Sequence, residues 1–176
     1  MELSLITAES FDEVMRHYTP TVYRIAFARL GNPADCEDVT QDVFVRYFRA
    51  GLTYESEEHR KAWLIHCAIN CTINFATSAH MRHRGDIENI EHFTESETLS
   101  ENVTENEFEK QELRRTVLKA VMQLPEKYRI PIHLFYFEDM PTAQIAQVTA
   151  TRESTVRSQL TRARKLLKNI LKGVEF

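Results

Sequence analysis

The sequence predicts an all-α fold of two small helical domains that are joined by an acidic, flexible linker. Apolar residues recur every three or four positions along most of the 176 residues, which is the spacing of amphipathic helices. Residues 86–109 break this pattern, because they hold nine acids and no lysine or arginine. We therefore expect a three-helix domain at 1–85, the linker at 86–109 and a four-helix domain at 110–176.

The composition narrows the class of protein. The chain is 43% hydrophobic and 27% charged, as is typical of a globular domain, and it has no 18-residue apolar run that would span a membrane. The first residues lack a basic leader with a long apolar segment, so no secretory signal is visible. Three cysteines cannot form a disulfide framework. We expect an intracellular, cytoplasmic protein.

The first helix is expected from Ser10 to Leu30. Its inward-facing residues recur at helical spacing: Phe11, Val14, Met15, Tyr18, Val22, Ile25 and Ala26. Gly31 ends this helix, and Asn32 is placed to cap the next one with Pro33 at its first position. Acids that follow Pro33 suit the positive end of the helix dipole. The second helix is then expected to end near Arg49.

The second helix has an acidic outer face. Val39, Val43, Phe44 and Tyr47 are expected to point inward. The outer positions are then acidic or polar: Glu37, Asp38, Gln41, Asp42 and Arg46. Such a face is most often simply solvated. It would equally suit docking on a basic helical partner, and the residues alone leave both interpretations open.

A third helix is expected from about Glu58 to Arg84, after a loop at 50–60. Cys67 and Cys71 lie one turn apart in it, beside His66, which is compatible with a metal site or a redox pair. They also continue the apolar stripe of the helix, and free cysteine packs well as a small hydrophobe. Because a structural zinc site needs about four ligands, core packing is the favoured interpretation.

The acidic stretch at 86–109 contains too few large apolar residues to offset the entropy of ordering it. Two interpretations of it remain open. It is either a spacer kept soluble by its charge, or a run of carboxylates that mimics a nucleic-acid backbone in a basic channel of a partner.

Four helices are expected after the linker. The first contains Phe108 and Leu113 and ends at Leu124-Pro125, and the second is an apolar and aromatic segment from about Glu126 to Phe137. The last two form a helix-turn-helix at 142–172, in which a short apolar-periodic segment precedes a longer one.

The last helix carries a strongly basic outer face. Residues 110–176 hold 13 basic and 6 acidic residues, although the net charge of the whole chain is −4. Cations interleaved with short polar side chains suit a helix whose first turns enter a DNA major groove while its flanks hold phosphates. The alternative is a solvated Lys/Arg-rich helix, which the short partner helix directly before it disfavours.

Four motifs in order around the linker resemble the extracytoplasmic-function (ECF) group of bacterial RNA polymerase sigma factors, which belongs to the sigma-70 family. The resemblance covers nearly the whole chain. The motifs are Cys36-Glu37-Asp38-Val39-Thr40-Gln41-Asp42-Val43-Phe44, Lys61-Ala62-Trp63-Leu64-Ile65 with Asn70, Leu124-Pro125-Glu126-Lys127-Tyr128-Arg129, and Thr155-Val156-Arg157-Ser158-Gln159-Leu160-Thr161-Arg162-Ala163-Arg164.

The resemblance implies that the first domain is sigma region 2 and the last is sigma region 4. It implies a non-enzymatic subunit without a cofactor, which directs core RNA polymerase to promoter DNA. The implied partners are the largest-subunit clamp and the flap of the polymerase, promoter DNA and an anti-sigma factor.

The resemblance also implies three sets of site residues. The polymerase core-binding set is Asp35, Glu37, Asp38, Gln41, Asp42, Phe44 and Arg46. The set for the melted −10 element is Tyr54, Arg60, Lys61, Trp63, Asn70, Arg82 and Arg84, where Trp63 is more readily explained as a core residue. The −35 set is Thr142, Gln144, Arg152, Glu153, Ser154, Thr155, Arg157, Ser158, Thr161, Arg162, Arg164 and Lys165.

The chain departs from the family pattern at several positions. Asn74 and Thr77 stand where members commonly have Asp and Arg, and His80 stands where an aromatic residue is frequent. Ala150 stands where the turn of the helix-turn-helix usually has glycine. An alanine in a left-handed turn costs on the order of 1 kcal/mol. These departures leave the family resemblance intact, but they predict weaker generic promoter affinity.

Two other classes of function compete with that of a sigma factor. A free-standing helix-turn-helix regulator would bind duplex operator DNA without polymerase and would assemble with two-fold symmetry. A small helical hydrolase built around His66, Cys67 and Cys71 is disfavoured, since the sequence has neither a nucleophile elbow nor a phosphate-cradling glycine loop and holds only 4 glycines.

Overall fold

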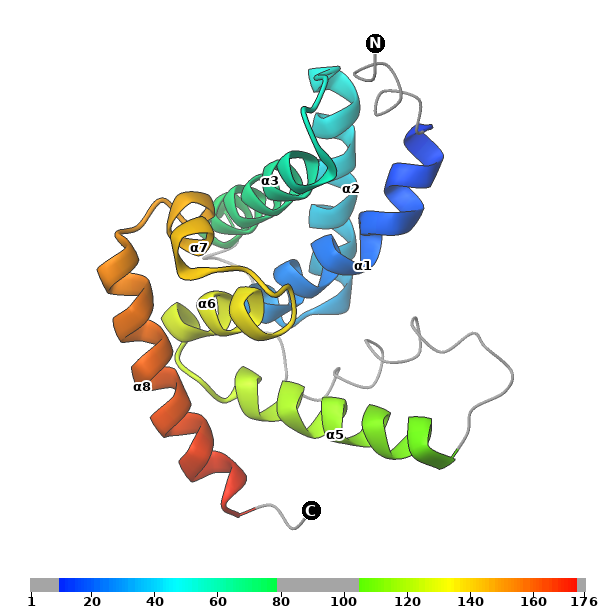
Figure 1. Ribbon diagram of the computed structural model, residues 1–176. Coiled ribbons are helices and arrows are strands. Elements are labelled where there is room, and N and C mark those ends of the chain that lie inside the picture. The colour runs from blue at the N-terminus through cyan, green and yellow to red at the C-terminus, as the bar shows by residue number, and fades with distance from the viewer. Residues whose placement is uncertain (1–9, 79–104, 174–176) are drawn as a thin grey trace.

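A computed structural model describes residues 10–78 and 105–173, and within these residues every regular element is an α-helix (Figure 1). The helices are α1 (Phe11–Leu30), α2 (Pro33–Ala50), α3 (Glu57–Ser78), α5 (Glu105–Met122), α6 (Glu126–Tyr136), α7 (Thr142–Val148) and α8 (Glu153–Leu171). The prediction of an all-α fold with helical units before and after the acidic stretch is confirmed.

The predicted break between the first two helices is confirmed in detail. Ser10 and Glu13 form a reciprocal capping box at the start of α1. Gly31 ends α1 in the left-handed conformation, with φ of 67°, which glycine adopts at little cost. The Asn32 side chain then accepts a hydrogen bond of 3.2 Å from the backbone of Asp35 and caps α2. Local chemistry alone therefore determines where α1 ends and α2 begins.

Helices α1, α2 and α3 pack on one another and bury one face each. Val22, Ile25, Val43 and Leu64 are completely buried at their centre. Cys36 and Cys71 are also buried among these apolar residues. The core-packing interpretation of Cys67 and Cys71 is thus confirmed for Cys71, whereas Cys67 is only partly buried. These three helices form the first helical unit.

The second unit begins earlier than the sequence pattern suggests. Helix α5 starts at Glu105, so residues 105–109, which were assigned to the linker, are helical. Glutamate and lysine are good helix formers, and this helix continues without a break into the apolar part that was expected. Phe108 and Leu113 on α5 remain exposed.

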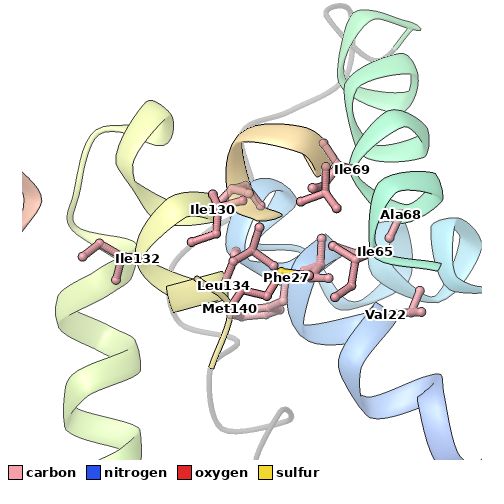
Figure 2. Close-up of a cluster of buried hydrophobic side chains, with 14 of the residues drawn as sticks. Val22, Phe27, Ile65, Ala68, Ile69, Ile130, Ile132, Leu134 and Met140 are labelled. Carbon is pink, nitrogen blue, oxygen red and sulfur yellow. The ribbon is translucent and has the colours of Figure 1, made fainter. Parts of the chain in front are cut away.

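The hydrophobic core runs without interruption from the first unit into the second (Figure 2). Helix α6 packs against α1, and α7 packs against α3. In Figure 2, Leu134 and Met140 lie beside Phe27 and Ile65. The structure is therefore a closed arrangement of the two units, which the expectation of two domains on a flexible linker did not include.

Within 10–78 and 105–173, none of the helices combines the length and apolar character needed to cross a lipid bilayer.

Candidate DNA-binding and polymerase-binding surfaces

The helix-turn-helix consists of α7, a turn at 149–152 and α8. Ala150 has a positive φ of 52°, as the sequence predicts for the residue that replaces the usual glycine. The backbone N–H of Thr151 donates to the carbonyl of Ala146 at 3.0 Å, and that of Ala150 to Gln147 at 3.2 Å. This is the Schellman pattern, which needs a left-handed residue after the helix end. It reverses the chain so that α8 can pack on α7.

A carboxylate joins the first turns of the two helices. Glu153 at the start of α8 accepts hydrogen bonds of 2.7 Å from the Thr142 hydroxyl and from Arg157. The hydrogen bond from Thr142, followed by that from Arg157, lowers the pKa of Glu153 below its ordinary value. Glu153 therefore stays ionised and holds α7 and α8 in a fixed relation at the end where a recognition helix would meet DNA.

Helix α8 buries only Val156, Leu160 and Ala163 and exposes its basic side. Of the predicted −35 set, Thr142 and Glu153 are half-buried and the others are exposed: Gln144, Arg152, Ser154, Thr155, Arg157, Ser158, Thr161, Arg162, Arg164 and Lys165. The helix-turn-helix thus presents these side chains on its surface, as a major-groove reader requires.

Arg164 differs from the rest of this set. Its Nε donates a 2.7 Å hydrogen bond to the hydroxyl of Tyr136, and its guanidinium lies 5.3 Å from the ring centre of Phe135 and 5.7 Å from that of Tyr136. Arg164 therefore fastens α8 to the end of α6. In this arrangement it supports the recognition helix from behind.

The residues predicted to meet a melted strand divide into two groups. Tyr54 and Arg60 are buried, at 7% and 3% exposure. Arg60 pairs with Glu57 at 2.7 Å and stacks over Tyr54 at 5.7 Å, and burial raises the pKa of Tyr54 to about 12. In this structure both side chains brace the loop before α3 from inside instead of facing solvent.

Trp63 is half-buried between two rings, with its centroid 5.9 Å from Tyr47 and 6.3 Å from Tyr54. This environment agrees with the interpretation of Trp63 as mainly a core residue. Lys61 lies at the boundary with the second unit, where it pairs with Glu138, and Asn70 is exposed on α3. Arg82 and Arg84 lie outside the described residues.

Helix α3 contacts α7 through polar side chains. The Nδ1 of His66 lies 2.9 Å from the carbonyl oxygen of Val148. Because a carbonyl oxygen can only accept, Nδ1 carries the hydrogen and donates it. The Nε2 of His66 then accepts from Asn70 at 3.0 Å. The end of α7 therefore sits against the part of α3 that the resemblance assigns to the −10 element.

Sequence reasoning missed a charged cluster at this boundary. Glu138, between α6 and α7, is 7% exposed. Its carboxylate lies 3.2 Å from Lys61 of α3, 3.4 Å from Arg24 of α1 and 3.7 Å from His133 of α6. A histidine and a glutamate five residues apart in an otherwise apolar segment were the available signal for this site.

The acidic outer face predicted for α2 is present. Glu37, Asp38, Gln41 and Asp42 are exposed, and Arg46 is exposed and pairs with Asp42 at 3.0 Å. Two members of the predicted polymerase-binding set are placed differently, because Asp35 is half-buried and Phe44 is 2% exposed. Phe44 packs in the core behind the acidic face.

Cys67 and Cys71 lie close to this face of α2. The Cys71 thiol donates to Asp42 at 3.4 Å. A hydrogen bond with Cys71 lowers the pKa of Cys67, and the nearby Arg46 acts in the same direction. Among the residues that the structure describes, no three His, Cys, Asp or Glu side chains are grouped to hold a metal ion.

Comparison with known proteins identifies the family of the chain. The family model "Sigma-70 region 2" matches residues 14–82, and "Sigma-70, region 4" matches residues 114–167. The chain is 25% identical to the ECF RNA polymerase sigma factor SigW of Bacillus subtilis over 170 residues, which cover 94% of this chain and 91% of that protein. It is 30% identical to the ECF RNA polymerase sigma-E factor of Escherichia coli over 139 residues, which cover 77% of this chain and 73% of that protein.

A solved structure has a similar fold. It is the sigma factor RpoE in complex with the anti-sigma factor NepR from Bartonella quintana, with a TM-score of 0.64, 20% sequence identity, and coverage of 92% of this chain and 96% of that one. The two family models match in order, and the relatives match along most of their length. Both findings favour a sigma factor over a free-standing regulator or a hydrolase. The chain belongs to the ECF group of the sigma-70 family and is a sigma factor that directs transcription initiation by RNA polymerase.

Proposed function

We propose that three surfaces of this sigma factor divide its task. The acidic outer face of α2 binds the largest-subunit clamp of core RNA polymerase, and the second unit meets the flap. Helix α3 and the loop before it bind the melted −10 element, and the α7–α8 helix-turn-helix reads the −35 element as duplex. Because core polymerase and promoter DNA are both in the cytoplasm, the protein acts there.

The observation that carries this proposal is the opposite charge of two exposed helix faces. Helix α2 exposes Glu37, Asp38 and Asp42 together, which an autonomous DNA-binding protein would not need and which DNA would repel. Helix α8 exposes Arg157, Arg162 and other cations on its solvent side. One face thus suits a basic protein surface and the other suits phosphates.

An anti-sigma factor is the expected regulator. The structurally similar RpoE is complexed with one, and the similarity of the two chains covers nearly their whole length. We place its binding on both units at once, since a partner that spans them would keep α3 and α8 from reaching a promoter together.

The test is a pull-down and run-off transcription assay with purified core polymerase. The variant Asp38→Arg reverses one charge at the centre of the α2 face and is expected to lose both co-purification with core and promoter-dependent transcripts. Asp12→Arg makes the same charge change on an exposed position of α1 and should retain both. Equal activity of the two variants would exclude the α2 face as the docking surface.

A second measurement separates the DNA-binding surfaces from the polymerase-binding one. Arg157→Ala is expected to weaken promoter binding by holoenzyme while leaving binding to core unchanged. A variant that loses core binding as well would show that α8 acts through the polymerase instead of through the −35 element.

A further inference from the structure

The Glu138 cluster joins the two units through a buried carboxylate. The side chain of Glu138 is 3% exposed, whereas those of Arg24 and Lys61 are 21% and 34% exposed. The Nζ of Lys61 also donates to the backbone carbonyl of Glu138 at 3.4 Å. Both cations belong to the first unit and the acid belongs to the second, so these two ion pairs exist only while the units are together.

The ionisation of this cluster follows from its surroundings. Burial raises the pKa of Glu138, but His133, Arg24 and Lys61 together outweigh burial and lower it below its ordinary value. His133 is completely enclosed, and burial lowers its pKa despite the neighbouring carboxylate. Near neutral pH the histidine is therefore uncharged, and Arg24 and Lys61 of the first unit balance the charge of Glu138.

Further contacts hold the same interface. Arg29 of α1 pairs with Glu126 of α6 at 2.9 Å, and His66 of α3 binds the carbonyl of Val148. Leu134 and Met140 add an apolar contact with Phe27 and Ile65 of the first unit (Figure 2). The closed arrangement therefore contacts α3 at Lys61 and at His66.

We propose that Arg24 and Lys61 form a binding site for a backbone phosphate of promoter DNA, and that Glu138 occupies this site in the closed arrangement. The inference rests on the proposed function of α3. A carboxylate and a phosphodiester both present anionic oxygens, which arginine and lysine bind in the same way. Because the site holds one anion at a time, the second unit inhibits strand binding until it moves away.

The proposed site differs from the surface that the sequence suggested. Arg24 lies on α1, far from the −10 residues in the sequence, and it reaches Lys61 only through the packing of α1 on α3. Arg60, which precedes Lys61, is committed to Glu57 inside the first unit. The two cations of the first unit that contact the Glu138 carboxylate are Arg24 and Lys61.

The test uses the full chain and two measurements. Hydrogen exchange of α3 and α7 reports opening, and fluorescence anisotropy of a short, fluorescein-labelled single-stranded oligonucleotide of mixed sequence reports phosphate binding. Glu138→Gln keeps the shape of the side chain and removes its charge, so we expect opening and oligonucleotide affinity each to rise by about tenfold. Asp139→Asn is the matched control, since this neighbouring acid is exposed and asparagine tolerates its positive φ of 51°.

The site is isolated by combining variants. Lys61→Met should abolish the gain in oligonucleotide affinity that Glu138→Gln produces, although the double variant should still open. Glu126→Lys opposes Arg29 and opens the interface without changing Glu138 or its cations. We therefore expect it to raise affinity by a smaller factor, because the exposed pair that it removes is weak. Circular dichroism melting of each variant confirms that both units remain folded.

The proposal would be overturned if α3 were unprotected from hydrogen exchange in the unaltered protein. It would also be overturned if Glu138→Gln and Asp139→Asn had the same hydrogen exchange and the same oligonucleotide affinity. Opening of Glu138→Gln without a gain in affinity would overturn the phosphate site. Run-off transcription by the unaltered protein with core polymerase tests the proposed function separately, so its failure is distinguishable from failure of this inference.

Discussion

The turn of the helix-turn-helix allows a quantitative test of backbone strain. Ala150 occupies the left-handed region at φ of 52°, where a Cβ atom costs roughly 1–2 kcal/mol relative to glycine. Glycine also raises the conformational entropy of the unfolded chain, which lowers the free energy of unfolding by about 0.4–1 kcal/mol. The difference predicts that Ala150→Gly stabilises the protein by about 0.5–1 kcal/mol. Its midpoint of thermal unfolding should rise by about 2–4 °C for each kcal/mol in a chain of this size.

The assay is urea unfolding followed by circular dichroism, with Ala143→Gly as the matched control. Ala143 is exposed in α7, where glycine costs up to about 1 kcal/mol because it lowers helix propensity. The same chemical change should therefore have opposite signs at the two positions. If both variants were destabilised equally, the turn would carry no strain. The departure of this chain from the family glycine would then have no energetic consequence.

The remaining predictions concern protons, phosphates and thiols. Burial lowers the pKa of His133 in the folded protein, so the unfolded chain binds its proton first, and stability should fall as pH drops below the ordinary histidine value of about 6.5. Urea midpoints measured on both sides of that pH should show this slope, and His133→Gln should flatten it. Arg162→Ala should reduce the salt dependence of promoter binding by holoenzyme by about one phosphate contact, and an unchanged slope would remove Arg162 from the interface. Iodoacetamide should alkylate Cys67 well before Cys36, since Cys67 is half-exposed with a lowered pKa whereas burial, the main cause, raises the pKa of Cys36 to about 12. Mass spectrometry of the digested protein tests that order.

Local chemistry was sufficient to predict much of the fold. Ser10, Gly31 and Asn32 carry strong capping signals within a few residues, and periodicity predicts the buried faces of α1, α2 and α8. The start of α5 was misplaced because residues 105–109 are charged, and a charge pattern resembles a linker even where the residues favour a helix. The exposed acids of α2 and cations of α8 followed from the same periodicity, because each helix has one clear apolar stripe.

The burial of Tyr54 and Arg60 could not be predicted from residue type. Aromatic and basic residues beside a loop suit stacking on bases and binding phosphates, and the sequence does not show that Glu57 lies within 2.7 Å of Arg60. Glu57 also accepts a 2.7 Å hydrogen bond from Tyr18 of α1. Long-range contacts of this kind decide whether a polar side chain faces solvent or braces a loop.

The packing of the two units was missed for a related reason, although α6 offered a signal. Residues Tyr128 to Phe137 are apolar or aromatic at almost every position, and a helix that is hydrophobic all round is buried on all sides. Its own unit covers one side through α8, so another surface must cover the rest, and α1 of the first unit does so. A helix with a single apolar stripe would allow the units to separate without exposing apolar surface. Because most of α6 beyond its first turn is apolar, opening has a cost in apolar exposure, and DNA or a protein partner must compensate for that cost when the sigma factor becomes active.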